Sequence, residues 1–160
     1  MTVWLGITTE NYPFCSDPAY EDAFFVNSFF YDAQARSNHR RGRISYVPFH
    51  LHQMPAGIAA QKPDIFMTAV PPMDKDGYFY LTPIQQIEAE MFQAVPTRIL
   101  EVNPRLPFLP GGKRIHISEV SCLIESDLPI SMPAERTPSA AERQAAQNAA
   151  ALVQDGDTIQ

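Results

Sequence analysis

The chain has 160 residues, 45% of them apolar and 19% charged, and carries a net charge of −6 at pH 7. A general nucleic-acid binder needs a basic face, and a membrane-spanning helix needs about 18 consecutive apolar residues, so the sequence argues against both classes of protein. Because it has two cysteines, Cys15 and Cys122, and no secretory leader, we expect a reducing, cytoplasmic setting with free thiols.

The first third of the chain is expected to form strands around one helix. Residues 3–8 begin as an apolar strand, whereas the aromatic run at residues 24–31 fits either a buried strand or the start of a helix. Asp32 is placed to cap a helix that ends near Gly42. Residues 44–49 are typical of a strand that a proline disturbs.

Two groups of side chains stand out in this region. Basic residues gather where the helix should end, and we interpret them as a solvated helix terminus, with contact to a phosphate or an acidic partner as the alternative. They are Arg36, His39, Arg40, Arg41 and Arg43. Eight aromatic residues are expected mostly in the core, or else at a partner interface. They are Tyr12, Phe14, Tyr20, Phe24, Phe25, Phe29, Phe30 and Tyr31.

The middle of the chain alternates strand and helix patterns. After a short helix around residues 54–61, the apolar run at residues 65–70 is typical of an interior parallel strand covered on both faces. A turn at residues 74–77 leads to a strand at residues 78–81. Thr82-Pro83 should cap the next helix. Its apolar face is expected to consist of Ile84, Ile87, Met91, Phe92 and Val95.

The last third contains shorter elements. A strand at residues 98–102 stops at Asn103-Pro104 and is followed by a loop, two short β-like pieces at residues 115–117 and 121–124, and a linker. The final helix should open at Thr137-Pro138 and close at Gly156. Residues 157–160 then start a further strand, so the chain looks truncated, with a naturally frayed end as the alternative.

This alternation predicts an α/β fold with an open, mainly parallel sheet and flanking helices. We expect residues 1–160 to form a single partial domain, incomplete at both ends. Functional groups of such a sheet should lie at the carboxyl ends of its strands.

Three stretches, in this order and spacing, resemble the acetyl-CoA hydrolase/transferase family, which includes 4-hydroxybutyrate CoA-transferase. The first is GRISYVP at residues 42–48. The second runs from DGYF at residues 76–79 to EVN at residues 101–103. The third is IHISEV at residues 115–120, with DGDTIQ at residues 155–160.

The resemblance implies two related α/β domains with the active site between them, of which this chain is similar to the N-terminal one. The family's opening segment would precede Met1. The strand that begins at Asp157 is similar to the one leading into the family's glycine-rich loop. That loop and the catalytic glutamate of a C-terminal domain would follow Gln160, so we expect no catalytic residue here and no activity of this chain alone.

The resemblance also implies the chemistry. A glutamate attacks an acyl-CoA, and the glutamyl-CoA thioester that results is opened by a small acid such as acetate or 4-hydroxybutyrate, or by water in an acetyl-CoA hydrolase. Coenzyme A is then a substrate, no other cofactor or metal is needed, and the complete enzyme is expected to be a homo-oligomer. From a different class, the chain could be a non-catalytic binding or assembly domain that docks to a separate second half.

Asn103 and Gln160 are the candidate substrate-binding residues, because each is a neutral polar group at a strand terminus. The alternatives are backbone capping for Asn103 and an exposed chain end for Gln160. Structural roles are expected for the glutamates, of which Glu88, Glu90 and Glu142 lie on predicted helices and Glu101, Glu119 and Glu125 near strand ends.

The histidines carry weaker signals. His50 and His52 would place two rings on one face of a strand, but no third metal ligand is suitably spaced. His116 is expected to donate a hydrogen bond at a strand edge.

Overall fold

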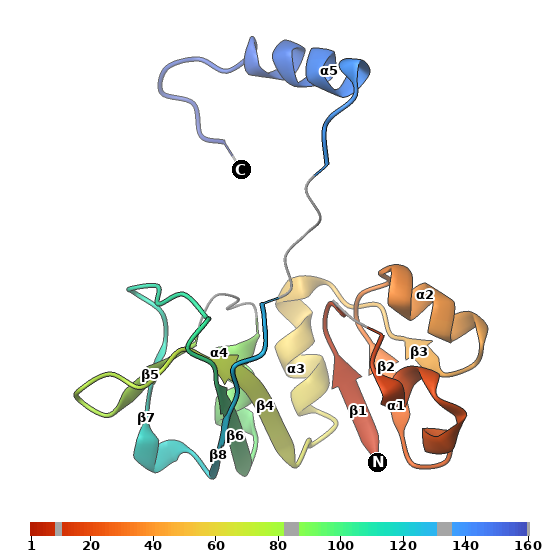
Figure 1. The fold of residues 1–160 in the computed structure, drawn as a ribbon, viewed down its shortest axis with the longest axis vertical. Helices are drawn as coiled ribbons and strands as arrows, with labels where there is room; N and C mark the ends of the chain where they lie inside the picture. The colour runs from red at the N-terminus through yellow and green to blue at the C-terminus, as the bar shows by residue number, and fades with distance from the viewer. Residues whose placement is uncertain (9–10, 82–86, 131–135, 160) are drawn as a thin grey trace. The chain divides into compact units, whose positions relative to one another are not determined.

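The computed structural model describes residues 1–8, 11–81, 87–130 and 136–159. They belong to two units, Met1–Ile130 and Ser131–Gln160. The first unit alternates parallel strands with helices, which confirms the predicted α/β class (Figure 1). Its parallel strands form two three-stranded sheets rather than one continuous sheet. None of the helices in the described part is long and apolar enough to cross a membrane.

The first sheet has the order β1-β2-β3, with all strands parallel. Its strands are β1 (Thr2–Leu5), β2 (Phe25–Ser28) and β3 (Ile44–Tyr46). The aromatic run at residues 24–31 therefore contains a strand. Val3, Val26 and Ile44 are register partners, and they share one face with the buried Cys15 of α1 (Pro13–Ser16).

The expected helix is α2 (Ala33–Arg40), and it begins as predicted at Asp32, whose Oδ1 accepts the N–H of Ala35 at 2.8 Å. His39 and Arg40 lie in its last turn and Arg41 follows as the C-cap, as the interpretation of a helix end predicts. Arg36 lies earlier in the helix, and Arg43 is paired with Glu21 at 3.1 Å rather than solvated. Of the aromatic residues, Phe29 is buried and four others pack against the core, whereas Tyr20, Phe25 and Tyr31 are exposed.

The second sheet is also parallel, with the order β4-β6-β8. Its strands are β4 (Ile65–Val70), β6 (Thr97–Val102) and β8 (Cys122–Glu125). The prediction that β4 is an interior strand is wrong. Among the residues that the structure describes, it pairs only with β6, and Ile65 and Met67 are 51% and 58% exposed. The other face of this sheet is covered, because Phe66 and Val70 contribute to the core.

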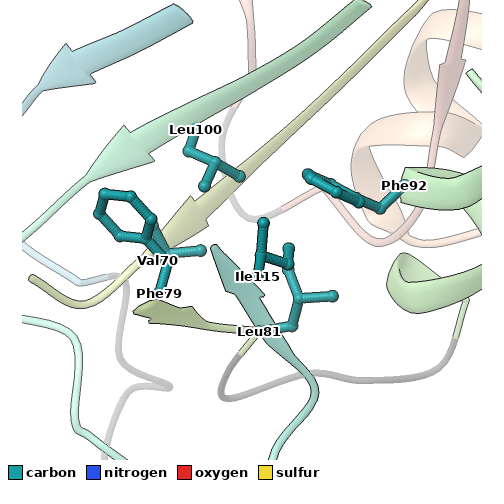
Figure 2. Packing of buried hydrophobic residues seen from close by; sticks show 6 residues of the cluster. All are labelled: Val70, Phe79, Leu81, Phe92, Leu100 and Ile115. Carbon is teal, nitrogen blue, oxygen red and sulfur yellow. The ribbon is translucent and has the colours of Figure 1, made fainter. Parts of the chain in front are cut away.

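That covered face carries the main hydrophobic core. β5 (Tyr78–Tyr80) pairs antiparallel with β7 (Arg114–His116), and α4 (Glu88–Ala94) packs beside them. The six side chains that meet here are shown in Figure 2: Val70, Phe79, Leu81, Phe92, Leu100 and Ile115. Met91, Phe92 and Val95 are buried as the helical spacing predicts, while the cap at Thr82-Pro83 and Ile84 lie outside the described residues.

Between the sheets lies α3 (Met54–Ala59), preceded by a short 3-10 helix at Leu51–Gln53 (Figure 1). Its Met54 and Ile58 form a second core cluster with Phe29, Met91 and Val95. Trp4 from β1 and Phe66 from β4 both pack against this cluster, so it joins the two sheets. Gly57 lets the ring of Phe49 lie against the helix, because a side chain at this position would meet the ring and force it to shift.

The second unit contains α5 (Ala140–Ala150), which starts at a capping box formed by Ser139 and Glu142. The prediction of its end is wrong, since the helix stops at Ala150. Gly156, with a φ of 93°, lies in a separate turn further along the chain. Residues 157–159 form no strand, contrary to the prediction, because no described residue pairs with them.

Candidate functional site

The carboxyl ends of β4, β6 and β8 meet at one edge of the second sheet, because the three strands are parallel and in register. Open parallel sheets bind ligands beyond this edge. The residues that follow the strands are polar or proline, namely Pro71-Pro72, Asn103-Pro104 and Ser126-Asp127. We call this set of strand ends the carboxyl edge.

Asn103 is the organising residue of the carboxyl edge. Its backbone N–H donates to the carbonyl of Val70 at 2.9 Å, and its side-chain Nδ2 donates to the carbonyl of Leu128 at 2.9 Å. Its Oδ1 accepts the N–H of Arg105 at 2.9 Å. At 6% exposure, Asn103 therefore ties the ends of all three strands together.

This arrangement favours backbone capping as the role of Asn103, since both polar groups of its side chain already bond to the main chain. A direct contact with substrate stays a prediction. Gln160, the second predicted substrate-binding residue, lies outside the described residues.

Arg105 brings a positive charge to the same edge. Its Nε donates to the carbonyl of Asp127 at 2.6 Å, which anchors the side chain while the residue stays exposed. From the sequence, Arg105 is only the start of a loop. The available signal was its position two residues after the strand-ending Asn103. A guanidinium held in this way can pair with a carboxylate or a phosphate.

The turn that follows β4 is fixed by Asp74. Its carboxylate accepts the N–H groups of Tyr78 and Asp76, at 2.8 and 3.0 Å, and the hydroxyl of Tyr80 at 3.0 Å. The bond from Tyr78 is the main reason that the pKa of Asp74 lies below its usual value. Gly77 completes the predicted turn with a φ of 86°. Asp74 thus serves as a structural anion.

The carboxyl side of the first sheet is closed by a similar contact. Oδ2 of Asp32 accepts both the N–H and the hydroxyl of Thr8, each at 2.8 Å. Partial burial alone would raise the pKa of Asp32, but the hydrogen bonds from Ala35 and Thr8 outweigh it and lower the pKa. The contact fixes the loop after β1 to the start of α2.

Three of the six glutamates considered above have structural partners. Glu88, Glu119 and Glu142 each accept a backbone N–H at the start of a helix. Glu90 is exposed on α4. Glu125 is exposed at the end of β8, and Glu101 is half-buried near the end of β6.

His50 and His52 do not lie on a strand. His50 and His52 flank and enter the 3-10 helix, where their rings stack with centroids 5.7 Å apart, so their predicted place on one strand face is wrong. The reason is that β3 ends at Tyr46, before Pro48. His116 lies at the end of β7, where its Nδ1 accepts the N–H of Ser118 at 3.3 Å, whereas a donated hydrogen bond was predicted. Within the described residues, no three potential ligands lie close enough to hold a metal ion.

Comparison with known proteins identifies relatives of this architecture. Residues 1–132 match the model of the acetyl-CoA hydrolase/transferase N-terminal domain. The chain is 28% identical over 158 residues to succinyl-CoA:cyclohexane-1-carboxylate CoA transferase of Geobacter metallireducens, covering 96% of this chain and 36% of that protein. It is 24% identical over 139 residues to 4-hydroxybutyrate coenzyme A transferase of Clostridium kluyveri, covering 86% and 32%.

Solved structures give the same result. RipA from Yersinia pestis superposes with a TM-score of 0.70 and 29% identity, over 86% of this chain and 34% of that one. The 4-hydroxybutyrate CoA-transferase of Porphyromonas gingivalis superposes with a TM-score of 0.64 and 27% identity, over 98% and 42%. The chain thus spans about a third of the length of these relatives.

Proposed function

The chain belongs to the acetyl-CoA hydrolase/transferase N-terminal domain family, and from this premise we propose that it is the first domain of an enzyme that moves coenzyme A between an acyl-CoA and a small carboxylic acid. The match over residues 1–132 carries this proposal. The names of the relatives support it, since they are CoA transferases that differ in the acid they use.

In the proposed reaction, a glutamate outside residues 1–160 attacks the carbonyl of the acyl-CoA and expels the CoA thiolate, which leaves a mixed anhydride. The thiolate then attacks the glutamyl carbonyl, releases the first acid and forms glutamyl-CoA. The second acid reverses these steps, and water takes its place in a hydrolase. The steps constitute covalent catalysis by a carboxylate.

The proposed part of this chain is to supply one wall of the site. The carboxyl edge, held by Asn103, faces the incoming substrates, and the anchored guanidinium of Arg105 attracts the carboxylate of the acid. The thiols of Cys15 and Cys122 are both free, as suits the reducing cytoplasm that we propose as the setting. Coenzyme A acts only as a substrate, and a C-terminal domain and further copies of the enzyme are the proposed partners.

A transfer assay tests this division of roles. We expect the purified 160-residue chain, given acetyl-CoA and labelled succinate or butyrate, to show no CoA exchange above buffer, because the proposed nucleophile lies outside residues 1–160. Its intact mass should also stay unchanged, without bound CoA. The Clostridium kluyveri relative, assayed in parallel, should turn over. Exchange that Glu101→Gln abolishes would contradict the proposal.

A further inference from the structure

A small pocket opens at the amino ends of β2 and β3 in the first sheet. Its volume is about 90 Å³. Phe14 of α1 lines it, together with Phe24 and Phe25 at the start of β2 and with residues 42–45 around the start of β3. The pocket shares no residue with the carboxyl edge of the second sheet, so the role proposed for that edge does not explain it.

The apolar part of the pocket is aromatic. The rings of Phe14 and Phe24 pack together with their centroids 5.5 Å apart, and both border the cluster that contains the buried Ile44. Phe25 also lines the pocket, but it is 59% exposed. A ligand that covered this ring would gain the free energy of removing apolar surface from water.

The polar part of the pocket is an ion pair with unequal exposure. Nη2 of Arg43 lies 3.1 Å from Oε2 of Glu21, and the two side chains are 16% and 63% exposed. The N–H of Arg43 donates to the carbonyl of Asn38 at 2.9 Å, which fixes the backbone that carries the cation. The guanidinium is thus largely shielded and held in place, whereas its carboxylate partner lies mostly in solvent.

Such a partner can be exchanged for another anion. An ion pair with an exposed member contributes little to stability, so a second carboxylate can take the place of Glu21 beside Arg43 at small cost. A guanidinium also binds a carboxylate well, because its fork of N–H donors matches the two oxygens.

The charges near the pocket also favour an anion. The exposed Arg40 and Arg41 directly precede the lining residues 42–45, and the exposed Asp22 directly follows Glu21. These residues and Arg43 give three arginines against two acids, although the whole chain carries a net charge of −6. The local excess of positive charge attracts small anions to this end of the sheet.

We propose that the pocket binds a short-chain aliphatic monocarboxylate. Its carboxylate replaces that of Glu21 at Arg43, and its alkyl chain packs against Phe24 and Phe25. The volume sets the length of the chain, since 90 Å³ corresponds to about three water molecules at about 30 Å³ each. The inference stands on the pocket alone and does not depend on CoA transfer.

A titration of the isotope-labelled 160-residue chain with sodium butyrate, followed by amide chemical shifts, gives the first test. We expect saturable shifts at Phe25, Arg43 and Ser45, with a Kd on the order of 1–10 mM. Acetate has a shorter chain and should bind at least about fivefold more weakly. Equal binding of the neutral butyramide, or the same shifts with sodium chloride at equal ionic strength, would overturn the proposal.

Three substitutions identify the residues responsible. Glu21→Gln removes the competing carboxylate and should strengthen butyrate binding about two- to fivefold. Arg43→Gln removes the cation and should weaken it at least about tenfold. Arg105→Gln is the matched control and should leave the shifts at Phe25 and Ser45 unchanged, which separates this pocket from the carboxylate contact proposed for Arg105.

Glu21→Gln is the decisive variant, because it leaves Arg43 in place and decides the question even if Arg43→Gln fails to fold. A purely structural ion pair predicts no gain in butyrate binding from this substitution. Unchanged or weaker binding by Glu21→Gln would therefore contradict the proposal, and so would loss of the shifts in Arg105→Gln.

Discussion

Replacing Phe92 with alanine is expected to lower the free energy of unfolding of the first unit by about 3–5 kcal/mol. The ring is 1% exposed and belongs to the buried cluster drawn in Figure 2. Truncation removes apolar contacts and leaves a cavity, and it also removes the ring on which the guanidinium of Arg98 stacks at 4.9 Å.

Urea unfolding followed by circular dichroism measures this effect, with Phe25→Ala as the matched control. Phe25 is also a phenylalanine but is 59% exposed, so its loss should change the free energy of unfolding by at most about 1 kcal/mol. Equal destabilisation by the two substitutions would mean that the core has been assigned wrongly.

Asn103→Ala should lower the free energy of unfolding by about 1–3 kcal/mol, because it leaves the N–H of Arg105 and the carbonyl of Leu128 without their partner. The effect should be local as well. The amides of residues 126–128 are expected to exchange faster, since the side chain of Asn103 holds this segment beside β6.

Asn103→Asp distinguishes the contributions of the two side-chain hydrogen bonds of Asn103, to Arg105 and to Leu128. It keeps an acceptor for Arg105 but loses the donor to Leu128, so exchange should increase near residues 126–128 and stay unchanged at Arg105. If both variants unfold at the wild-type urea concentration and leave these amides unchanged, the proposed role of Asn103 in holding the carboxyl edge is wrong.

Local signals predicted much of the fold. Asp32 precedes a helix that ends near a glycine, and the apolar stripe with Met91 and Phe92 marks a buried helical face; both predictions are confirmed. Each depends on contacts within a few residues, which a sequence displays directly. The motifs at residues 42–48, 76–103 and 115–120 also led to the correct family.

Non-local contacts explain the errors. The apolar run at residues 65–70 cannot reveal that β4 stands at the edge of its sheet, because strand order depends on residues far away in the chain. The hydrogen bonds made by the side chain of Asn103 could be predicted only in part from the sequence. The proline after it suggested capping, but its partner Leu128 is 25 residues away.

The sequence predicted which edge of the sheet carries the candidate site, but not which side chains organise it. Rules for parallel sheets place functional groups after the strands, and Asn103 lies there. Arg105 was missed because an arginine in a proline-rich loop looks like an ordinary surface residue. Only the bond from its Nε to Asp127 distinguishes it.

The position of the reacting carboxylate tests the proposed function most directly. Residues 1–160 can replace the matching part of the Clostridium kluyveri 4-hydroxybutyrate coenzyme A transferase. The hybrid is then incubated with acetyl-CoA, digested and analysed by mass spectrometry. We expect CoA in thioester linkage on a glutamate of the relative's portion and none on this chain. A CoA thioester on Glu101, or on any other glutamate of residues 1–160, would contradict the account.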